Sequence, residues 1–158
     1  MNLSEKIAIV TGASSGLGAA FAIALVAKGA TVYGLARNAE KLSAIQNRLG
    51  DTFVPIAMDI TNQNAITSWV NNTFSNSYLP HILINNAGAG YFGKVDELSL
   101  EQWHAMINTN LNGVFYISAK VVPFMKKNSD SCHIINIGSV LGKTSRAGAV
   151  GYSASKYG

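Results

Sequence analysis

A tyrosine and a lysine near the end of the sequence could together exchange a proton with a substrate. Tyr152 and Lys156 stand at i and i+4 in Tyr152-Ser153-Ala154-Ser155-Lys156, so on a helix they lie on one face, one turn apart. A free phenol releases its proton only near pH 10, and a nearby ammonium favours the ionised form. Such a pair could serve as the general acid for reducing a ketone or the base for oxidising an alcohol. The ordinary alternative is two surface residues, since this spacing often arises by chance.

Two further polar residues could complete such a proton-transfer site. Ser139 ends the run Ile134-Ile135-Asn136-Ile137-Gly138-Ser139, 13 residues before Tyr152. Open α/β sheets build their sites at strand ends, where this hydroxyl could orient and polarise a substrate oxygen, although a lone serine there is usually a turn residue. Asn110, in Asn108-Thr109-Asn110-Leu111-Asn112-Gly113, is the fourth candidate, with a locally bonded helix asparagine as the alternative.

A glycine-rich turn follows the first aliphatic run. Its glycines are Gly12, Gly16 and Gly18, and a helix is predicted directly after them. Glycine allows a sharp turn and leaves no Cβ between the backbone and a phosphate, and a helix N-terminus offers free N–H donors to a pyrophosphate. A plain strand-to-helix turn could use the same residues. The predicted phosphate-binding residues are Gly12, Ser14, Ser15, Gly16, Leu17 and Gly18.

The end of the second predicted strand bears on which nicotinamide cofactor could bind. An NAD site usually has Asp or Glu here for the ribose 2′-hydroxyl, but this sequence has Ala36 followed by Arg37. Arginine can meet a 2′-phosphate with charge-assisted forked hydrogen bonds. The residues therefore predict NADP(H) in preference to NAD(H), against the alternative of an ordinary exposed arginine.

Two later segments supply the remaining cofactor candidates. Asp59 and Ile60 follow the third predicted strand, where the aspartate could equally be a turn or capping residue. Asn86, Ala87 and Gly88 close the fourth strand in Asn85-Asn86-Ala87-Gly88. Small residues there would let a cofactor approach the backbone, while the asparagines could also tie strands together.

The elements that must position these residues alternate along the chain. Short aliphatic runs indicate buried strands, and the segments between them have helical periodicity. This alternation predicts a doubly wound, Rossmann-like parallel sheet with helices on both faces, in one domain over residues 1–158. The predicted strands are 7–10, 31–36, 53–58, 81–84 and 133–137. The predicted helices are 19–28 with Gly29 as its stop, one from Asn38 to Gly50, one capped by Thr61 or Asn62 that carries Ile66, Trp69, Val70 and Phe74, and a long one from Ser99 that Pro123 kinks or ends.

Composition excludes several classes of function. The 158 residues are 48% hydrophobic and only 13% charged, against about 25% charged in an average domain. The net charge is +4 without a basic stripe, so no nucleic-acid partner is expected. The single cysteine, Cys132, suits a small buried filler, and the three histidines lack metal-ligand spacing. No apolar stretch reaches the ~20 residues that span a bilayer, so we expect a soluble cytoplasmic protein.

Taken in order, these motifs resemble the short-chain dehydrogenase/reductase family. The matching elements are the T-G-x-x-x-G-x-G turn at residues 11–18, N-N-A-G at 85–88, Asn110, Ser139 and the Tyr152/Lys156 pair. The resemblance covers residues 6–158.

The resemblance implies an NADP(H)-dependent oxidoreductase that moves a hydride between the nicotinamide and a carbonyl or secondary alcohol. Tyr152 would exchange the proton, Ser139 would orient the substrate, and Lys156 would also bond the nicotinamide ribose. Asn110 would bend the long helix and hold a water that relays protons to the lysine. Asp59 would contact the adenine amino group. The family also implies a homodimer or homotetramer for the full-length protein.

The sequence departs from the family at its end. It stops two residues after Lys156, whereas family members add two more strands and a substrate-binding loop. We expect a fragment of a longer protein, the alternative being a short, inactive relative. Rival functions are a non-catalytic NADP-binding sensor and an epimerase or dehydratase with a tightly held cofactor. The segment 90–92 and residues 141–150 are expected to line part of the pocket, and their small and apolar residues favour a non-ionic substrate.

Overall fold

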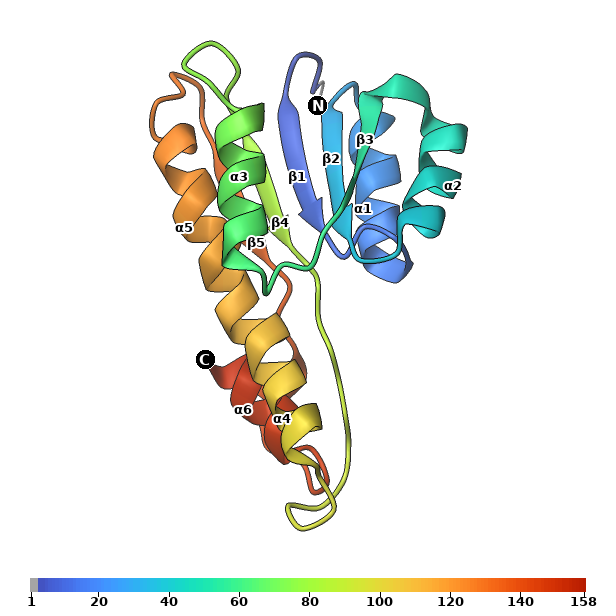
Figure 1. Ribbon diagram of the computed structural model, residues 1–158, viewed down its shortest axis with the longest axis vertical. Helices are drawn as coiled ribbons and strands as arrows, with labels where there is room; N and C mark the ends of the chain where they lie inside the picture. Colours follow the sequence, from blue (N-terminus) through green and yellow to red (C-terminus); the bar gives the residue numbers. More distant parts are fainter. Residues whose placement is uncertain (1–2) are drawn as a thin grey trace.

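The computed structural model describes residues 3–158, which form one parallel sheet covered by helices (Figure 1). The strands are β1 (Ile7–Thr11), β2 (Thr31–Ala36), β3 (Phe53–Ala57), β4 (Ile82–Asn85) and β5 (His133–Asn136). They lie in the order β3-β2-β1-β4-β5, and every neighbouring pair is parallel. This arrangement confirms the predicted Rossmann-like α/β class.

Helices cover both faces of this sheet (Figure 1). α1 (Gly16–Val26) and α2 (Ala39–Leu49) pack on one face, while α3 (Gln63–Thr73) and α5 (Gly113–Met125) pack on the other. α4 (Leu100–Ile107) and α6 (Val150–Tyr157) extend together beyond the carboxyl ends of the strands. Short 3₁₀ turns occupy Gly50–Thr52 and Val140–Gly142.

The alternation of side chains along β1 explains why both faces are covered. Successive residues of a strand point to opposite faces. Ala8 and Val10 belong to the core under α1 and α2, whereas Ile7 and Ile9 belong to the core under α3 and α5. All of β1 is buried, as expected for a central strand of a parallel sheet.

Polar caps fix where the helices begin. The Asn38 side chain accepts from Lys41 N–H (2.8 Å), which starts α2 as predicted. Asn62 accepts from Ala65 N–H (3.0 Å), so it, and not Thr61, caps α3. Ser99 caps α4 in a reciprocal capping box with Gln102.

Two predicted boundaries were wrong. α1 begins at Gly16, three residues earlier than the alanine-rich segment suggested, because the helix starts inside the glycine turn. Of the two outcomes predicted for Pro123, a kink or an end, the end is wrong, because the helix continues to Met125. A proline within a helix removes its own N–H bond and its ring crowds the carbonyl four residues earlier, and only two residues of α5 follow Pro123.

The long helix is interrupted at its centre. Residues Asn108–Asn112 form a single π-turn between α4 and α5. Insertions of this kind commonly occur at functional sites, and this one contains Asn110.

β5 is an exposed edge of the sheet. Its four residues are all solvent-exposed, and Ile134 and Ile135 each retain 45% of their accessible surface. The apolar run therefore does not lie in a closed core, and Cys132 before it is only half-buried, contrary to the buried filler expected. No helix within residues 3–158 is both long and apolar enough to cross a membrane.

Candidate active site

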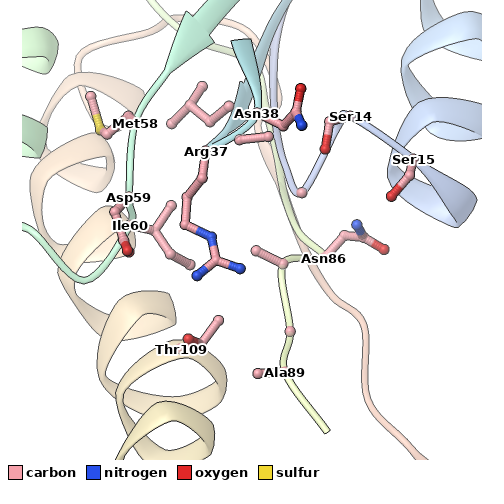
Figure 2. A pocket seen from close by; sticks show the side chains of 15 residues that line it. Ser14, Ser15, Arg37, Asn38, Met58, Asp59, Ile60, Asn86, Ala89 and Thr109 are labelled. Atoms are coloured by element: carbon pink, nitrogen blue, oxygen red, sulfur yellow. The ribbon is translucent and has the colours of Figure 1, made fainter. Parts of the chain in front are cut away.

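A cleft opens where the strand order reverses. β1 is followed in space by β2 on one side and β4 on the other, and ligands of open α/β sheets bind at such a switch point. The cleft there has a volume of about 540 Å³ (Figure 2). It is lined by Gly12, Ser14, Ser15, Leu35, Ala36, Arg37, Asn38, Met58, Asp59, Ile60, Asn86, Ala87, Gly88, Ala89 and Thr109.

The floor of the cleft is tied together by Thr11. Its buried hydroxyl oxygen accepts hydrogen bonds from the N–H groups of Asn86 and Ala87, both at 3.0 Å. In turn, the Asn86 side-chain amide donates a hydrogen bond to the Thr11 carbonyl (3.0 Å). The loop after β4 is thereby held against the end of β1. Asn85, one residue earlier, donates to Asn136 on β5 (2.8 Å), so the asparagines do tie strands together.

Glycine is required at two positions of the turn. Gly12 has φ +68°, and a Cβ on it would lie 2.9 Å from Ala87 Cα. A Cβ on Gly18 would clash with the Gly12 carbonyl and with the Asn86 amide. The turn therefore packs directly on the loop after β4, with no room for side chains.

The start of α1 is open to a ligand. Ser15 is its N-cap residue, but its side chain makes no capping hydrogen bond. The first N–H groups of α1 thus keep the donors and partial positive charge that suit a phosphate. Gly12, Ser14 and Ser15 line the cleft, whereas Gly16, Leu17 and Gly18 lie outside its lining.

Arg37 extends into the cleft from the end of β2, its guanidinium between Ile60 and Asn86 (Figure 2). It makes no ion pair with any of residues 3–158. Ala36 before it carries no acid for a ribose hydroxyl. The cationic side chain is therefore available to a ligand.

Asp59 and Ile60, which follow β3, also line the cleft. Asp59 Oδ1 accepts from Thr61 N–H (2.9 Å), so this carboxylate has the turn role that the sequence allowed, while it also faces the cleft. The sequence did not single out Met58 or Thr109 as lining residues. Thr109 lies in the π-turn, which brings it to the cleft, and no local sequence pattern signals that approach.

Asn110 joins the cleft to the helix that carries Tyr152 and Lys156. Its Oδ1 accepts from Ala89 N–H (2.7 Å), and its Nδ2 donates to the Ala89 carbonyl (2.8 Å) and to Ser155 Oγ (2.8 Å). Asn110 is buried, as is Ser155. Sequence reasoning gave Asn110 a role but missed Ser155 and Ala89.

Lys156 turns toward the end of β5. Its ammonium donates to the Ile137 carbonyl (2.9 Å), two residues before Ser139. Burial lowers the pKa of Lys156 below its usual value. Ser139 Oγ accepts from Leu141 N–H (3.2 Å), which leaves its own proton free for a substrate oxygen.

Tyr152 lies beside the loop that continues the cleft. A Cβ on Gly90 would meet its ring at 3.4 Å, and Phe92 packs on it with ring centroids 5.6 Å apart. Lys156 Nζ lies 6.0 Å from the centre of the same ring. One short segment, residues 88–92, therefore touches the cleft, Asn110 and Tyr152 in turn.

The cleft residues fit a nicotinamide dinucleotide. A cradle without side chains at Gly12, an open helix N-terminus and an unpaired arginine match a pyrophosphate and a further phosphate.

A family model described as "short chain dehydrogenase" matches residues 6–158. The chain belongs to the short-chain dehydrogenase family. This family of oxidoreductases was the one that the sequence motifs resembled.

Curated short-chain dehydrogenase relatives match the whole chain. A 3-oxoacyl-[acyl-carrier-protein] reductase FabG of Vibrio harveyi is 37% identical over 158 residues, covering 100% of this chain and 64% of the relative. An uncharacterized oxidoreductase of Staphylococcus epidermidis is 34% identical, covering 98% and 66%. The chain thus spans about two thirds of the length of these relatives.

Solved short-chain dehydrogenase structures share the fold. A metagenomic short-chain oxidoreductase in complex with NADP superposes with a TM-score of 0.91 at 36% identity, covering 99% of this chain and 72% of that one. The closed form of a serine dehydrogenase complexed with NADP+ gives a TM-score of 0.89 at 33% identity, covering 96% and 61%.

Proposed function

We propose that this short-chain dehydrogenase is an NADP(H)-dependent oxidoreductase of carbonyl compounds or secondary alcohols. The observation that carries the proposal is the continuity of one loop. Ala89 lines the dinucleotide cleft and bonds Asn110, and the next residue, Gly90, packs on the Tyr152 ring. A cofactor in the cleft and a substrate beside Tyr152 would therefore meet along this loop.

The choice of NADP(H) rests on the end of β2. Arg37 reaches into the cleft without a partner among residues 3–158, and Ala36 supplies no carboxylate. Guanidinium groups bind phosphate oxygens with paired hydrogen bonds. Two of the similar solved structures hold NADP or NADP+ by their own descriptions.

The chain's own residues would supply the proton transfer and the orientation. Tyr152 would give its hydroxyl proton to the substrate oxygen during reduction, and take one back during oxidation. Lys156, whose ammonium lies 6.0 Å from the centre of the Tyr152 ring, would bond the nicotinamide ribose. Ser139, whose oxygen already accepts from Leu141, would keep its proton and donate a hydrogen bond to the same substrate oxygen. The nicotinamide, when bound, supplies or accepts the hydride.

The relatives' names narrow the substrates worth testing. One is named for a 3-oxoacyl group and another for serine, and each of these compounds carries an oxygen on its third carbon when the acyl or carboxyl carbon is counted as the first. The segment after Ser139 is not purely apolar, because Lys143 and Arg146 are exposed there. We therefore include 3-oxoacyl thioesters and 3-hydroxy acids beside the neutral ketones and aldehydes that the sequence favoured.

The test is turnover of the intact protein. We expect NADPH oxidation with at least one carbonyl compound of this panel, and a loss of about 10²–10⁴ in kcat for Tyr152→Phe with unchanged NADPH affinity. Tyr157→Phe is the matched control, because Tyr157 lies on the same helix and is 57% exposed. Tight NADPH binding without any turnover would favour the sensor alternative instead.

The assembly and cellular location stay predictions. A homodimer or homotetramer is consistent with Phe115, a large apolar side chain that is 68% exposed on α5. A monomeric mass by light scattering at micromolar concentration would contradict the oligomer. Fractionation of cells would test the cytoplasmic location.

A further inference from the structure

Ser155 stands between the catalytic tyrosine's backbone and Asn110. Its Oγ accepts from Asn110 Nδ2 (2.8 Å) and donates to the Tyr152 carbonyl (2.8 Å). Ser155 is only 2% exposed. The Ser155 hydroxyl therefore has a partner both as acceptor, on the π-turn, and as donor, within α6.

The Asn110 amide can take only one orientation in this network. Its oxygen faces the Ala89 N–H, and its two N–H bonds point to the Ala89 carbonyl and to Ser155 Oγ. Turning the amide over would set N–H against N–H and oxygen against oxygen at Ala89. The direction of the Ser155 hydroxyl is thereby fixed as well, because its oxygen must accept and its proton must go to Tyr152.

We propose that Ser155 is a positioning residue that sets Tyr152 in register with the cofactor cleft. Ala89 lines that cleft, and Asn110 bonds both the N–H and the carbonyl of Ala89. Ser155, which accepts from Asn110, donates to the Tyr152 carbonyl, so this chain of hydrogen bonds links the cleft wall to the backbone of Tyr152. This inference rests on the proposed function, since it concerns the tyrosine of that reaction. Ser155 touches neither cofactor nor substrate in this account and acts through Tyr152.

Ser153 offers a matched control on the same helix. It is also buried, at 8% exposure, but its hydroxyl has no hydrogen-bond partner among residues 3–158. Ser153→Ala and Ser155→Ala therefore make the same chemical change on α6, and only the second removes bonds.

We expect Ser155→Ala to lower kcat by about tenfold with little change in KM or NADPH affinity, because one orienting network is lost. Ser153→Ala should keep the wild-type kcat. Ser155→Thr, which retains the hydroxyl, should restore most of the rate. If Ser155→Ala does not fold, Ser155→Cys replaces it, since a thiol fills the site yet bonds weakly. Equal kcat values for the Ser155 and Ser153 variants would overturn the proposal.

A double variant tests whether Ser155 acts through Asn110. Groups in one hydrogen-bond network give non-additive effects, so Asn110→Ala combined with Ser155→Ala should have the kcat of Asn110→Ala alone. A kcat lowered by the product of the two separate effects would overturn the proposal. Wild-type protein without turnover on the whole panel would instead contradict the proposed function, so the two failures are distinguishable.

Discussion

The cleft and the proposed catalytic end of the molecule, around Asn110, Tyr152 and Lys156, are held in different ways. In the cleft floor the Thr11 hydroxyl and the Asn86 side chain each bond main-chain groups, and Gly12 packs directly on the main chain of the loop after β4. At the catalytic end, side chains make the connections, with Asn110 spanning two elements and Lys156 bonded to one carbonyl. The first region is therefore formed by the fold itself, and changes there should cost stability. Changes in the second region are expected to lower the rate more than they lower the stability.

The largest effect should come from Thr11→Val, which attacks the cleft floor. Valine keeps the shape but leaves the part-buried N–H groups of Asn86 and Ala87 without their acceptor. An unpaired donor costs about 1–3 kcal/mol when it is buried. We expect the free energy of unfolding to fall by about 2–4 kcal/mol, measured by urea denaturation. Thr31→Val is the control at the start of β2. Equal, small losses for both variants would break the contrast between the two regions.

Arg37→Ala should sharpen the contrast, because it removes a ligand contact from the cleft without touching its floor. We expect NADPH affinity to weaken by about tenfold to a hundredfold, with NADH affinity and stability nearly unchanged. Arg48→Ala, an exposed arginine in the last turn of α2, is the matched control. Isothermal titration would measure all three proteins, and similar NADPH affinity in the wild type and Arg37→Ala would contradict the predicted cofactor preference.

Phe92→Ala tests the catalytic end. A ring pair contributes about 0.5–1.5 kcal/mol, so KM for the carbonyl substrate should rise about twofold to tenfold. Phe92→Leu, which keeps apolar area without the ring, should give a smaller rise. NADPH affinity should not change in either variant, and a change there would show that the two ends are less separate than proposed.

The smallest expected effect lies at the amino ends of β1 and β4, away from the cleft. His81 Nδ1 accepts from Ile7 N–H (3.2 Å), and Nε2 lies 3.4 Å from Asp130. Burial, followed by the charge of Lys6, lowers the pKa of His81. The unfolded chain therefore takes up the proton more readily, so this contribution to stability is present above about pH 6.5 and is lost as pH falls below it.

Thermal unfolding at pH 7.5 and 5.5 would check this sign. We expect the wild type to lose stability on acidification, and His81→Asn, whose amide oxygen can still accept from Ile7, to lose less. A loss of the same size in both proteins would contradict the assignment. His104→Asn, at an exposed position on α4, is the control.

Much of the fold was predictable because it depends on local patterns. Alternation of aliphatic runs and helical periodicity gave all five strands, and side-chain caps such as Asn38 marked where helices begin. The residues by themselves did not predict the π-turn, where Asn110 bonds a loop 21 residues earlier in the chain, although the family resemblance implied a bend at Asn110. The exposure of β5 was missed for a similar reason, since an apolar run does not reveal whether anything packs beyond it.

The candidate site follows the same division. The motif residues Gly12, Arg37 and Asp59 do line one cleft, as their places after strands suggested. No local sequence pattern indicates a role for Thr109 or Ser155, because each contacts the site only through residues that the fold brings beside it.

The π-turn also changes the angular phase of the long helix. A single extra residue advances the side-chain pattern by about 100° around the axis. Met106 of α4 accordingly meets Gly151 of α6, while Ile117 and Val121 of α5 face the sheet. A regular α-helix through the same residues would put Met106 and Ile117, which are 11 residues apart, within about 20° of each other on one stripe. One helix face could then satisfy either the sheet or α6 but not both.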